Sequence, residues 1–321
     1  MGDVTRLLIT GAGGFIGRAT VAEARARELE VTALVRRTCG DWAGDAGVTE
    51  LICDLADPAS VATVAKAAQG CGAVIHAAAH LGADAGAIAA DTLAATRHLL
   101  EALPPAMRLV LVSSTAVYDL SRPAPGAVLD EGAALCPPGR GPDPYANAKL
   151  AQETLCRASG HPLWLIRPGA VWGPGRTWHA LNGVDAMALH LTLASEGALP
   201  LAHVTQLAKA LVSAALTAPE GVEALNVVDD DLPTRGRFVA AHRRAAGWPR
   251  VALSLPWTAW LGLARALRPV SSHLPGLLRE PVLRARILPL QWPNTALRAR
   301  LGGRDDAPFE EMLRRSLEGR A

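Results

Sequence analysis

The chain has 321 residues, of which 50% are hydrophobic and 19% are charged, so it is neither a disordered tail nor a fibre. It contains no uninterrupted apolar run of about 18 residues, which argues against a membrane span. Its N-terminus leads straight into a strand-like run, with no signal peptide before it. The five cysteines are scattered, without a CxxC pair or a histidine cluster. We therefore expect reduced thiols in a cytoplasm and no metal site.

The formal net charge of +2 conceals an uneven distribution. Residues 1–234 hold 16 basic and 24 acidic residues, a net charge of −8. Residues 235–321 hold 16 basic and 6 acidic residues, a net charge of +10. A basic last quarter suits an anionic substrate, a membrane surface or nucleic acid, or it forms an arginine-rich solvated face. Because Leu, Trp and Pro interrupt the basic residues, we discount nucleic acid as a partner.

Short apolar runs alternate with longer alanine-rich segments over the first two-thirds of the chain. The predicted strands are 6–10, 31–35, 50–53, 73–76, 109–113 and 163–167, and the predicted helices are 14–28, 58–68, 86–103 and 144–158. Parallel strands need crossover connections, so this alternation predicts βαβ units. Strands that are apolar throughout indicate a sheet covered by helices on both faces. The predicted fold class is α/β, with a doubly wound parallel sheet of the Rossmann type.

The alternation ends after Pro168. Before that point, residues 121–144 are predicted to form a surface loop. After it, we predict loop and helix at 172–202, a helix at 204–217, a strand at 224–228 and helices interrupted by prolines from 232 onward. We therefore expect two units. The first is a dinucleotide-binding domain over residues 1–171 and 203–230. The second is a smaller, mostly helical substrate-binding lobe over residues 172–202 and 231–321.

A glycine-rich turn joins the first predicted strand to the first predicted helix. Gly11, Gly14 and Gly17 follow a GxxGxxG spacing, which allows a tight turn and a close approach of the backbone to a pyrophosphate. The free N–H groups and the dipole at the start of the helix favour an anion there. A glycine turn by itself is weak evidence, but its place between a strand and a helix predicts a dinucleotide cofactor.

The end of the second strand indicates which dinucleotide is bound. A carboxylate usually holds the ribose 2′-hydroxyl at this place, but the chain has Arg36 and Arg37 instead. Guanidinium groups suit a 2′-phosphate, so NADP(H) is favoured and NAD(H) remains an alternative. Asp54 and Leu55, after the third strand, are expected to flank the adenine.

Tyr145 and Lys149 stand four residues apart at the start of a predicted helix, which places both side chains on one face. We expect the ammonium group to lower the pKa of the phenol, making Tyr145 an acid/base near neutral pH. With only two tyrosines and three lysines in the chain, this spacing is rarely accidental. Ser114 follows the fifth strand, where its hydroxyl would donate to a substrate oxygen that becomes negative.

These motifs resemble the extended short-chain dehydrogenase/reductase group, also called the NAD-dependent epimerase/dehydratase family. The matching pieces are TGAGGFIG (Thr10–Gly17), VIHAAA (Val74–Ala79), LVSSTAVY (Leu111–Tyr118), DPYANAK (Asp143–Lys149), RPGAVWGPG (Arg167–Gly175) and AHV (Ala202–Val204). They occur in the family's order and span residues 7 to about 230.

The resemblance assigns roles to individual residues. It implies that Ser114 orients the substrate oxygen, that Tyr145 gives or takes the proton, and that Lys149 holds the ribose and tunes Tyr145. It also implies cofactor contacts at Phe15, Ile16, Ala77 and Ala78, and a nicotinamide lined by Pro168 to Val171.

The chain departs from the family pattern at several positions. Thr92 and His98 stand where the family often has asparagine, so a proton-relay asparagine is unsupported. The motif usually written HVxD ends in Gln206 rather than in an acid. The segment between Gly175 and His203 is short for a clamp around a sugar nucleotide.

Three functions are compatible with these residues. The first is an NADP(H)-dependent reductase or dehydrogenase acting on the carbonyl or secondary alcohol of a bulky small molecule, resembling dihydroflavonol reductases and 3β-hydroxysteroid dehydrogenases. The second is a sugar-nucleotide epimerase or dehydratase, and the third is a non-catalytic NADPH-binding regulator. Six of the eight tryptophans lie in or beside the second unit, where they indicate either an apolar substrate or an aromatic core. By resemblance to the family we also expect a homodimer.

Overall fold

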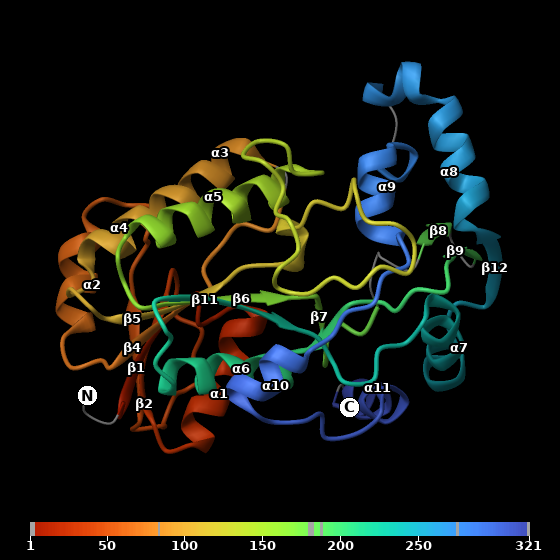
Figure 1. Cartoon of the computed structure of the whole chain (residues 1–321). Helices are drawn as coiled ribbons and strands as arrows, with labels where there is room; N and C mark the ends of the chain where they lie inside the picture. The colour runs from red at the N-terminus through yellow and green to blue at the C-terminus, as the bar shows by residue number, and fades with distance from the viewer. Residues whose placement is uncertain (1–3, 83, 179–182, 187–188, 274–275, 320–321) are drawn as a thin grey trace.

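The computed structural model describes residues 4–82, 84–178, 183–186, 189–273 and 276–319. Its centre is a seven-stranded sheet with the strand order β11-β6-β5-β4-β1-β2-β3, in which every pairing is parallel (Figure 1). The strands are β1 (Arg6–Thr10), β2 (Glu30–Val35), β3 (Val48–Ile52), β4 (Ala73–His76), β5 (Arg108–Val112), β6 (Leu163–Pro168) and β11 (Val222–Val227). The strand order reverses between β1 and β4, so the predicted doubly wound fold is confirmed.

Helices cover both faces of this sheet, as the apolar strands predict. Successive side chains of β1 face opposite sides: Leu7 and Ile9 belong to one hydrophobic cluster, and Leu8 belongs to another. The first cluster includes side chains of α1 (Phe15–Ala26) and α6 (Val204–Leu216). The second includes side chains of α2 (Ser60–Ala68), α4 (Ala95–Ala102) and α5 (Pro144–Ala158).

The helix predicted over 86–103 is interrupted. It consists of α3 (Ala85–Ile88), a π-helical turn η1 (Ala89–Ala94) and then α4. Such π-helical turns within α-helices are often found at functional sites. The side chain of Thr92 lies in this turn and is buried.

The second unit contains more strand than we predicted. β7 (Ala170–Trp172) pairs with β10 (Leu201–His203), and β8 (Gly183–Ala186), β9 (Leu189–Ala194) and β12 (Val251–Pro256) form a three-stranded sheet. The predictions of loop and helix over 172–202, and of helices alone after 232, are therefore wrong. β9 pairs with a strand about 60 residues further along the chain, Leu189 lying opposite Val251. Local periodicity does not reveal a pairing at that separation.

The remaining elements follow β11 and lie mostly in the second unit. They are α7 (Arg235–Ala246), α8 (Trp257–Ala266), η4 (Arg268–His273), η5 (Gly276–Leu278), α9 (Glu280–Ile287), α10 (Thr295–Leu301) and α11 (Phe309–Glu318). Leu297 of α10 belongs to the hydrophobic core of the central sheet. The division into a dinucleotide-binding domain and a substrate lobe thus stays an interpretation, because the C-terminal segment packs on both. None of the helices in the described part of the chain has the length and apolar character needed to cross a bilayer.

Several tryptophans of the second unit form an aromatic core. The ring of Trp178 contacts the rings of His190, Phe238, His242 and Trp248, with centroids 4.3–5.6 Å apart. Trp172 is fully buried, and its Nε1 donates to Asp229 Oδ2 at 2.7 Å. For these tryptophans, the interpretation as core describes the structure better than the interpretation as substrate contacts.

The predicted homodimer would use the outer faces of the helices at 86–103 and 144–158. The small and apolar residues predicted to form the interface are Ala87, Ala90, Ala94, Ala148, Leu150, Ala151 and Leu155. Of these, Ala148 and Leu150 are buried within the chain and therefore do not form part of an interface. Ala90, Ala94, Ala151 and Leu155 remain at least partly exposed. We expect light scattering at micromolar concentration to give the mass of two chains, because these small side chains allow helices to approach closely. A monomer mass there would contradict the prediction.

Candidate active site

The predicted site residues come together at the carboxyl edge of the central sheet. Thr10, the last residue of β1, lies opposite His76 of β4 and Leu34 of β2. The loops that follow these strands and β5 and β6 therefore emerge side by side at one edge. This edge is where open α/β sheets bind ligands.

The glycine turn has the geometry that a pyrophosphate requires. Gly11 has a φ of +66°, and a Cβ there would lie 2.8 Å from the backbone nitrogen of Ala78. Gly17 packs against the backbone of Gly11 and Ala12 so closely that no side chain fits. Gly14 caps α1 without a side-chain hydrogen bond, which leaves the first N–H groups of the helix directed at this edge.

The other predicted cofactor residues surround this turn. Ala77 and Ala78 follow β4 directly and lie against Gly11. The Arg176 guanidinium stacks over the Phe15 ring, 4.9 Å from its centroid. Leu55 is anchored through its carbonyl oxygen, to which His98 Nδ1 lies at 2.8 Å. The described residues thus place the expected pyrophosphate and adenine contacts along one edge.

The two arginines after β2 differ in their surroundings. Arg36 Nη1 lies 2.8 Å from Asp91 Oδ2, so its charge is already partly matched within the chain. The side chain of Arg37 is exposed. A 2′-phosphate would have to compete with Asp91 for Arg36, whereas Arg37 is accessible.

Ser114 and Tyr145 meet at the end of β5. The Ser114 hydroxyl lies close enough to the Tyr145 phenol to lower the pKa of that phenol. Ser114 Oγ also accepts from the backbone nitrogen of Ala116 at 3.1 Å, which orients it. Burial raises the pKa of the Tyr145 phenol above its usual value, and the Ser114 hydroxyl opposes this only in part. The pKa of Tyr145 is therefore raised, and not lowered as we expected, because desolvation dominates and the charge of Asp143 adds to it.

Ser113, the residue before Ser114, does not belong to the site. Ser113 Oγ donates to Glu153 Oε1 at 2.6 Å, deep in the protein. The same carboxylate receives two hydrogen bonds from Arg167, at 2.9 and 2.8 Å. Arg167 Nη1 also donates to the Tyr118 hydroxyl at 3.0 Å. Ser113 and Tyr118 thus belong to a buried ion-pair network behind the site.

The ammonium group of Lys149 is held by the chain itself. Its Nζ donates to the carbonyl oxygen of Val112 at 2.7 Å and to Gln152 Oε1 at 2.9 Å. Burial lowers the pKa of Lys149 to about 8, and the nearby side chains of Cys156 and Glu153 oppose this shift. Lys149 is thus close to Tyr145 along the helix but hydrogen-bonded toward the interior.

A polar network behind Lys149 was not predicted from the sequence. Gln152 Nε2 lies 2.9 Å from Thr96 Oγ1 and 3.2 Å from His76 Nε2. His76 Nδ1 lies 2.7 Å from Thr10 Oγ1. Burial and the charge of Lys149 lower the pKa of His76 to about 3, so the imidazole is neutral. The network therefore ties Lys149 to the ends of β1 and β4. The only sign of this network in the sequence is Gln152, a polar residue at a position of α5 that faces the interior.

The positions that depart from the family pattern have structural roles. Thr92 Oγ1 accepts from the backbone nitrogen of His80 at 2.9 Å. His203 caps α6, its side chain accepting from the backbone nitrogen of Thr205. Gln206, in place of the missing acid, is buried in the first turn of α6. Pro168 accepts a hydrogen bond from Thr115 Oγ1 at 3.3 Å, and Val171 lies in β7.

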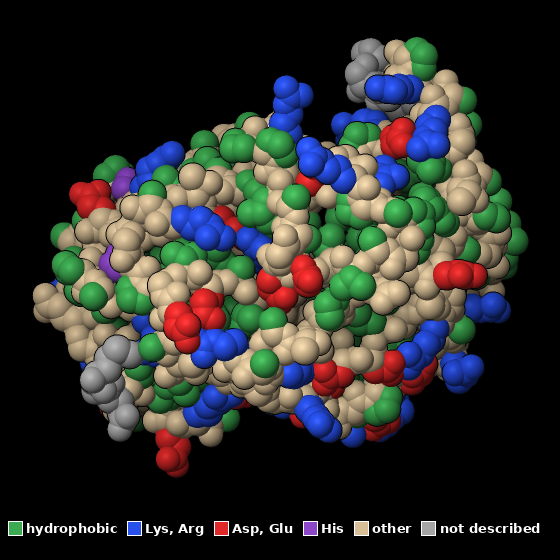
Figure 2. Space-filling view, in the orientation of Figure 1, with side chains coloured by type: hydrophobic (Ala, Val, Ile, Leu, Met, Phe, Trp, Pro, Cys, Tyr) green, Lys and Arg blue, Asp and Glu red, His purple; other side chains and the backbone are tan. Residues whose placement is uncertain are grey.

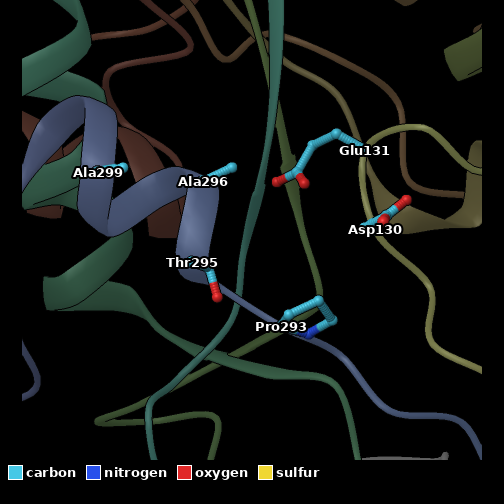
Figure 3. A pocket seen from close by; sticks show the side chains of 6 residues that line it. All are labelled: Asp130, Glu131, Pro293, Thr295, Ala296 and Ala299. Carbon is cyan, nitrogen blue, oxygen red and sulfur yellow. The ribbon is translucent and has the colours of Figure 1, made fainter.

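Two hollows lie beyond the end of β11, and none of the predicted catalytic residues lines either. The first, about 400 Å³, separates the loop with Asp130 and Glu131 from the start of α10 (Figure 3). The second, about 760 Å³, lies beside the C-terminal segment. Its lining includes the carboxyl side chains of Glu196, Asp229, Asp230 and Asp231.

The profile of the NAD dependent epimerase/dehydratase family matches residues 7–227. The chain belongs to this family. It is an enzyme of the NAD-dependent epimerase/dehydratase type, as the motifs predict. No curated protein matches it by sequence.

Solved structures with the fold of this epimerase/dehydratase family member are numerous, and their identities to it are low. The terminal R domain from the myxalamid PKS-NRPS biosynthetic pathway is 21% identical, with a TM-score of 0.73 over 99% of this chain and 91% of that one. UDP-glucose 4-epimerase from Bifidobacterium longum, in complex with NAD+ and UDP, is 19% identical, with a TM-score of 0.70 over 98% of each chain. The NAD-dependent NDP-hexosamine 5,6-dehydratase TunA is 18% identical, with a TM-score of 0.69 over 98% and 97% of the two chains. At these identities the likeness establishes a shared fold.

The lowered pKa of Lys149 predicts how cofactor binding by this epimerase/dehydratase family member depends on pH. If the ammonium holds the ribose, affinity for the dinucleotide should fall as the pH rises through about 8, where Lys149 in the free protein loses its proton. Titration calorimetry on either side of that pH measures the change. Lys149→Met should bind weakly at both pH values and show no such step. Equal affinities for the native protein on both sides would contradict the role of Lys149.

Proposed function

We propose that the protein transfers a hydride between NADP(H) and the carbonyl or secondary alcohol of a bulky small molecule. The observation that carries the proposal is the proximity of the Ser114 and Tyr145 side chains at the sheet edge, with Lys149 one helical turn further on. Bound nicotinamide would supply the hydride acceptor or donor. The glycine turn suits that cofactor, because the close backbone packing at Gly11 and Gly17 forms the tight turn from which α1 begins.

In this proposal, the proton moves at the Tyr145 hydroxyl. The raised pKa keeps the phenol protonated at neutral pH, so it is ready to donate to a carbonyl oxygen that gains negative charge. Ser114 donates a second hydrogen bond to the same oxygen and holds it in line with Tyr145. Lys149 supplies positive charge close by when a substrate and cofactor displace water.

A second candidate is a sugar-nucleotide epimerase or dehydratase. It is favoured by the names of two structural neighbours, the UDP-glucose 4-epimerase and the NDP-hexosamine 5,6-dehydratase. Against it stands the segment between Gly175 and His203, which is short for a clamp around a sugar nucleotide.

The balance of cofactor consumed against product formed separates the candidates. A reductase oxidises one NADPH for each carbonyl reduced, whereas an epimerase or dehydratase regenerates its cofactor in every cycle. The purified protein should be incubated with NADPH and a panel of apolar ketones, and separately with NAD+ and sugar nucleotides. We expect loss of absorbance at 340 nm with a ketone. Conversion of a sugar nucleotide without net loss of the cofactor would overturn the reductase assignment, and binding without any turnover would indicate a regulator.

We further propose that NADP(H) is bound more tightly than NAD(H). Arg36 and Arg37 together would form two charge-assisted hydrogen bonds to the 2′-phosphate, enough for a preference of at least about tenfold. Because Asp91 already pairs with Arg36, Arg37→Ala should lower the preference more than Arg36→Ala does. Isothermal titration with both cofactors measures this. Arg97→Ala, on the exposed side of α4, is a matched control that should change neither affinity. Equal affinities of the native protein for the two cofactors would contradict the proposal.

A further inference from the structure

An exposed apolar surface lies in the C-terminal part of the chain, away from the dinucleotide edge. We call residues 250–273 and 276–279 the arm. It comprises β12, α8, η4 and η5, and in Figure 1 its helix α8 projects from the rest of the molecule. Ten large hydrophobic side chains of the described residues are exposed, and half of them lie in the arm. These five are Val251 (50% exposed), Leu253 (54%), Leu255 (40%), Leu263 (45%) and Val270 (50%).

The apolar side chains follow the periodicity of their elements. Val251, Leu253 and Leu255 alternate along β12 and therefore share one face of this edge strand. On α8, the inner side chains of Leu261 and Ala264 pack in a core with α9. The exposed residues of α8 are Thr258, Ala259, Gly262, Leu263 and Ala266, with Arg265 as the one charged residue among them. Figure 2 shows hydrophobic side chains along the outer edge of the arm. A surface helix ordinarily turns mostly charged residues outward, whereas α8 exposes a single one.

Basic charge surrounds this apolar surface. Residues 232–304 contain thirteen arginines, no lysine and a single acidic residue, Glu280. Arg250, Arg265, Arg268 and Arg279 lie within the arm and are exposed. Glu280 pairs with Arg265 at 3.0 Å, so it neutralises one of the four. The arm thus combines exposed leucine and valine with an excess of positive charge, the pattern of segments that lie in a membrane interface.

We propose that the arm docks the protein onto an anionic lipid bilayer. The leucines of β12 and α8 would enter the boundary between headgroups and acyl chains, while the arginines would contact lipid phosphates. Charge decides between this occupant and a second copy of the chain. Two arms facing one another would bring together eight arginines at close range, which is repulsive. Nucleic acid would leave the apolar faces of β12 and α8 unmatched. The docking is peripheral and independent of the reaction assigned to the active site.

Vesicle flotation with the full chain tests this proposal. We expect the protein to float with vesicles of phosphatidylcholine and phosphatidylglycerol, to bind more weakly as salt is added, and to stay behind with phosphatidylcholine alone. Failure to float with the mixed vesicles at low salt would overturn the proposal. So would concentration-dependent self-association, if changing the leucines abolished it, because the second copy would then be the occupant.

Substitutions on the arm separate insertion from simple charge attraction. Leu253→Ser combined with Leu263→Ser should weaken binding at least about tenfold, because two leucines lose their burial in lipid. Arg268→Gln should weaken it about fivefold through the loss of one charge. Val222→Ser, a matched control at a valine 41% exposed on β11, should leave binding unchanged. All of these side chains are exposed, so thermal unfolding should stay the same. If the leucine variant bound like the native protein while Arg268→Gln did not, the arm would be adsorbed by charge alone and the proposed insertion would be wrong.

Discussion

Replacing Tyr145 with phenylalanine is expected to lower turnover by about 10²–10⁴-fold, the usual contribution of a well-placed general acid. The change removes one hydroxyl, which lies beside the Ser114 side chain. The fold and the affinity for the dinucleotide should therefore be retained. Steady-state kinetics, with cofactor affinity measured separately, checks both parts.

A matched pair of variants controls this experiment. Ser114→Ala removes the second donor to the reacting oxygen and should lower the rate by a smaller factor, of about 10²–10³. Ser113→Ala changes the adjacent serine, whose hydroxyl serves Glu153, and should act on stability rather than on the rate at saturating substrate. Near-normal turnover by Tyr145→Phe would show that the chemistry takes place elsewhere, and the reductase assignment would have to be abandoned.

Replacing Arg167 with methionine is expected to destabilise the protein by about 3–5 kcal/mol. The change leaves the carboxylate of Glu153 without its charge partner. This carboxylate is buried and hydrogen-bonded to Arg167 through both of its oxygens. Removing one partner of a buried pair leaves an uncompensated charge, and this costs far more than the pair itself contributes. Unfolding in urea, followed by circular dichroism, gives the change in free energy.

Arg157→Met provides the comparison for this prediction. Arg157 also approaches Glu153, at 3.7 Å, but its side chain is 43% exposed. Its loss should change stability by less than about 1 kcal/mol, as for other solvent-exposed ion pairs. Similar stabilities for Arg167→Met and Arg157→Met would show that burial does not control the energy of this network.

The local pattern of the chain determined the central sheet and the main features of the site. The bounds of β1, β4 and α5 agree with the predictions to the residue. The two strands are short apolar runs, and the helix has a clear N-terminal capping signal. Asp143 caps α5 and Pro144 begins it, so the helix that carries Tyr145 and Lys149 starts where local chemistry demands. The spacing of Gly11, Gly14 and Gly17 likewise predicts the turn, because Gly11 and Gly17 pack so closely on backbone that no larger residue fits.

Only the tertiary structure decided how those residues are used. β9 becomes a strand because β12, far along the chain, supplies its partner. The phenol of Tyr145 is harder to ionise, and not easier, because burial raises its pKa and the charge of Asp143 adds to that shift. The ammonium group of Lys149 is directed at Val112 by a hydrogen bond that forms only once α5 lies on β5. Strand pairing, desolvation and buried hydrogen bonds all depend on which residues surround a group in space. The spacing of residues along the chain does not show these surroundings.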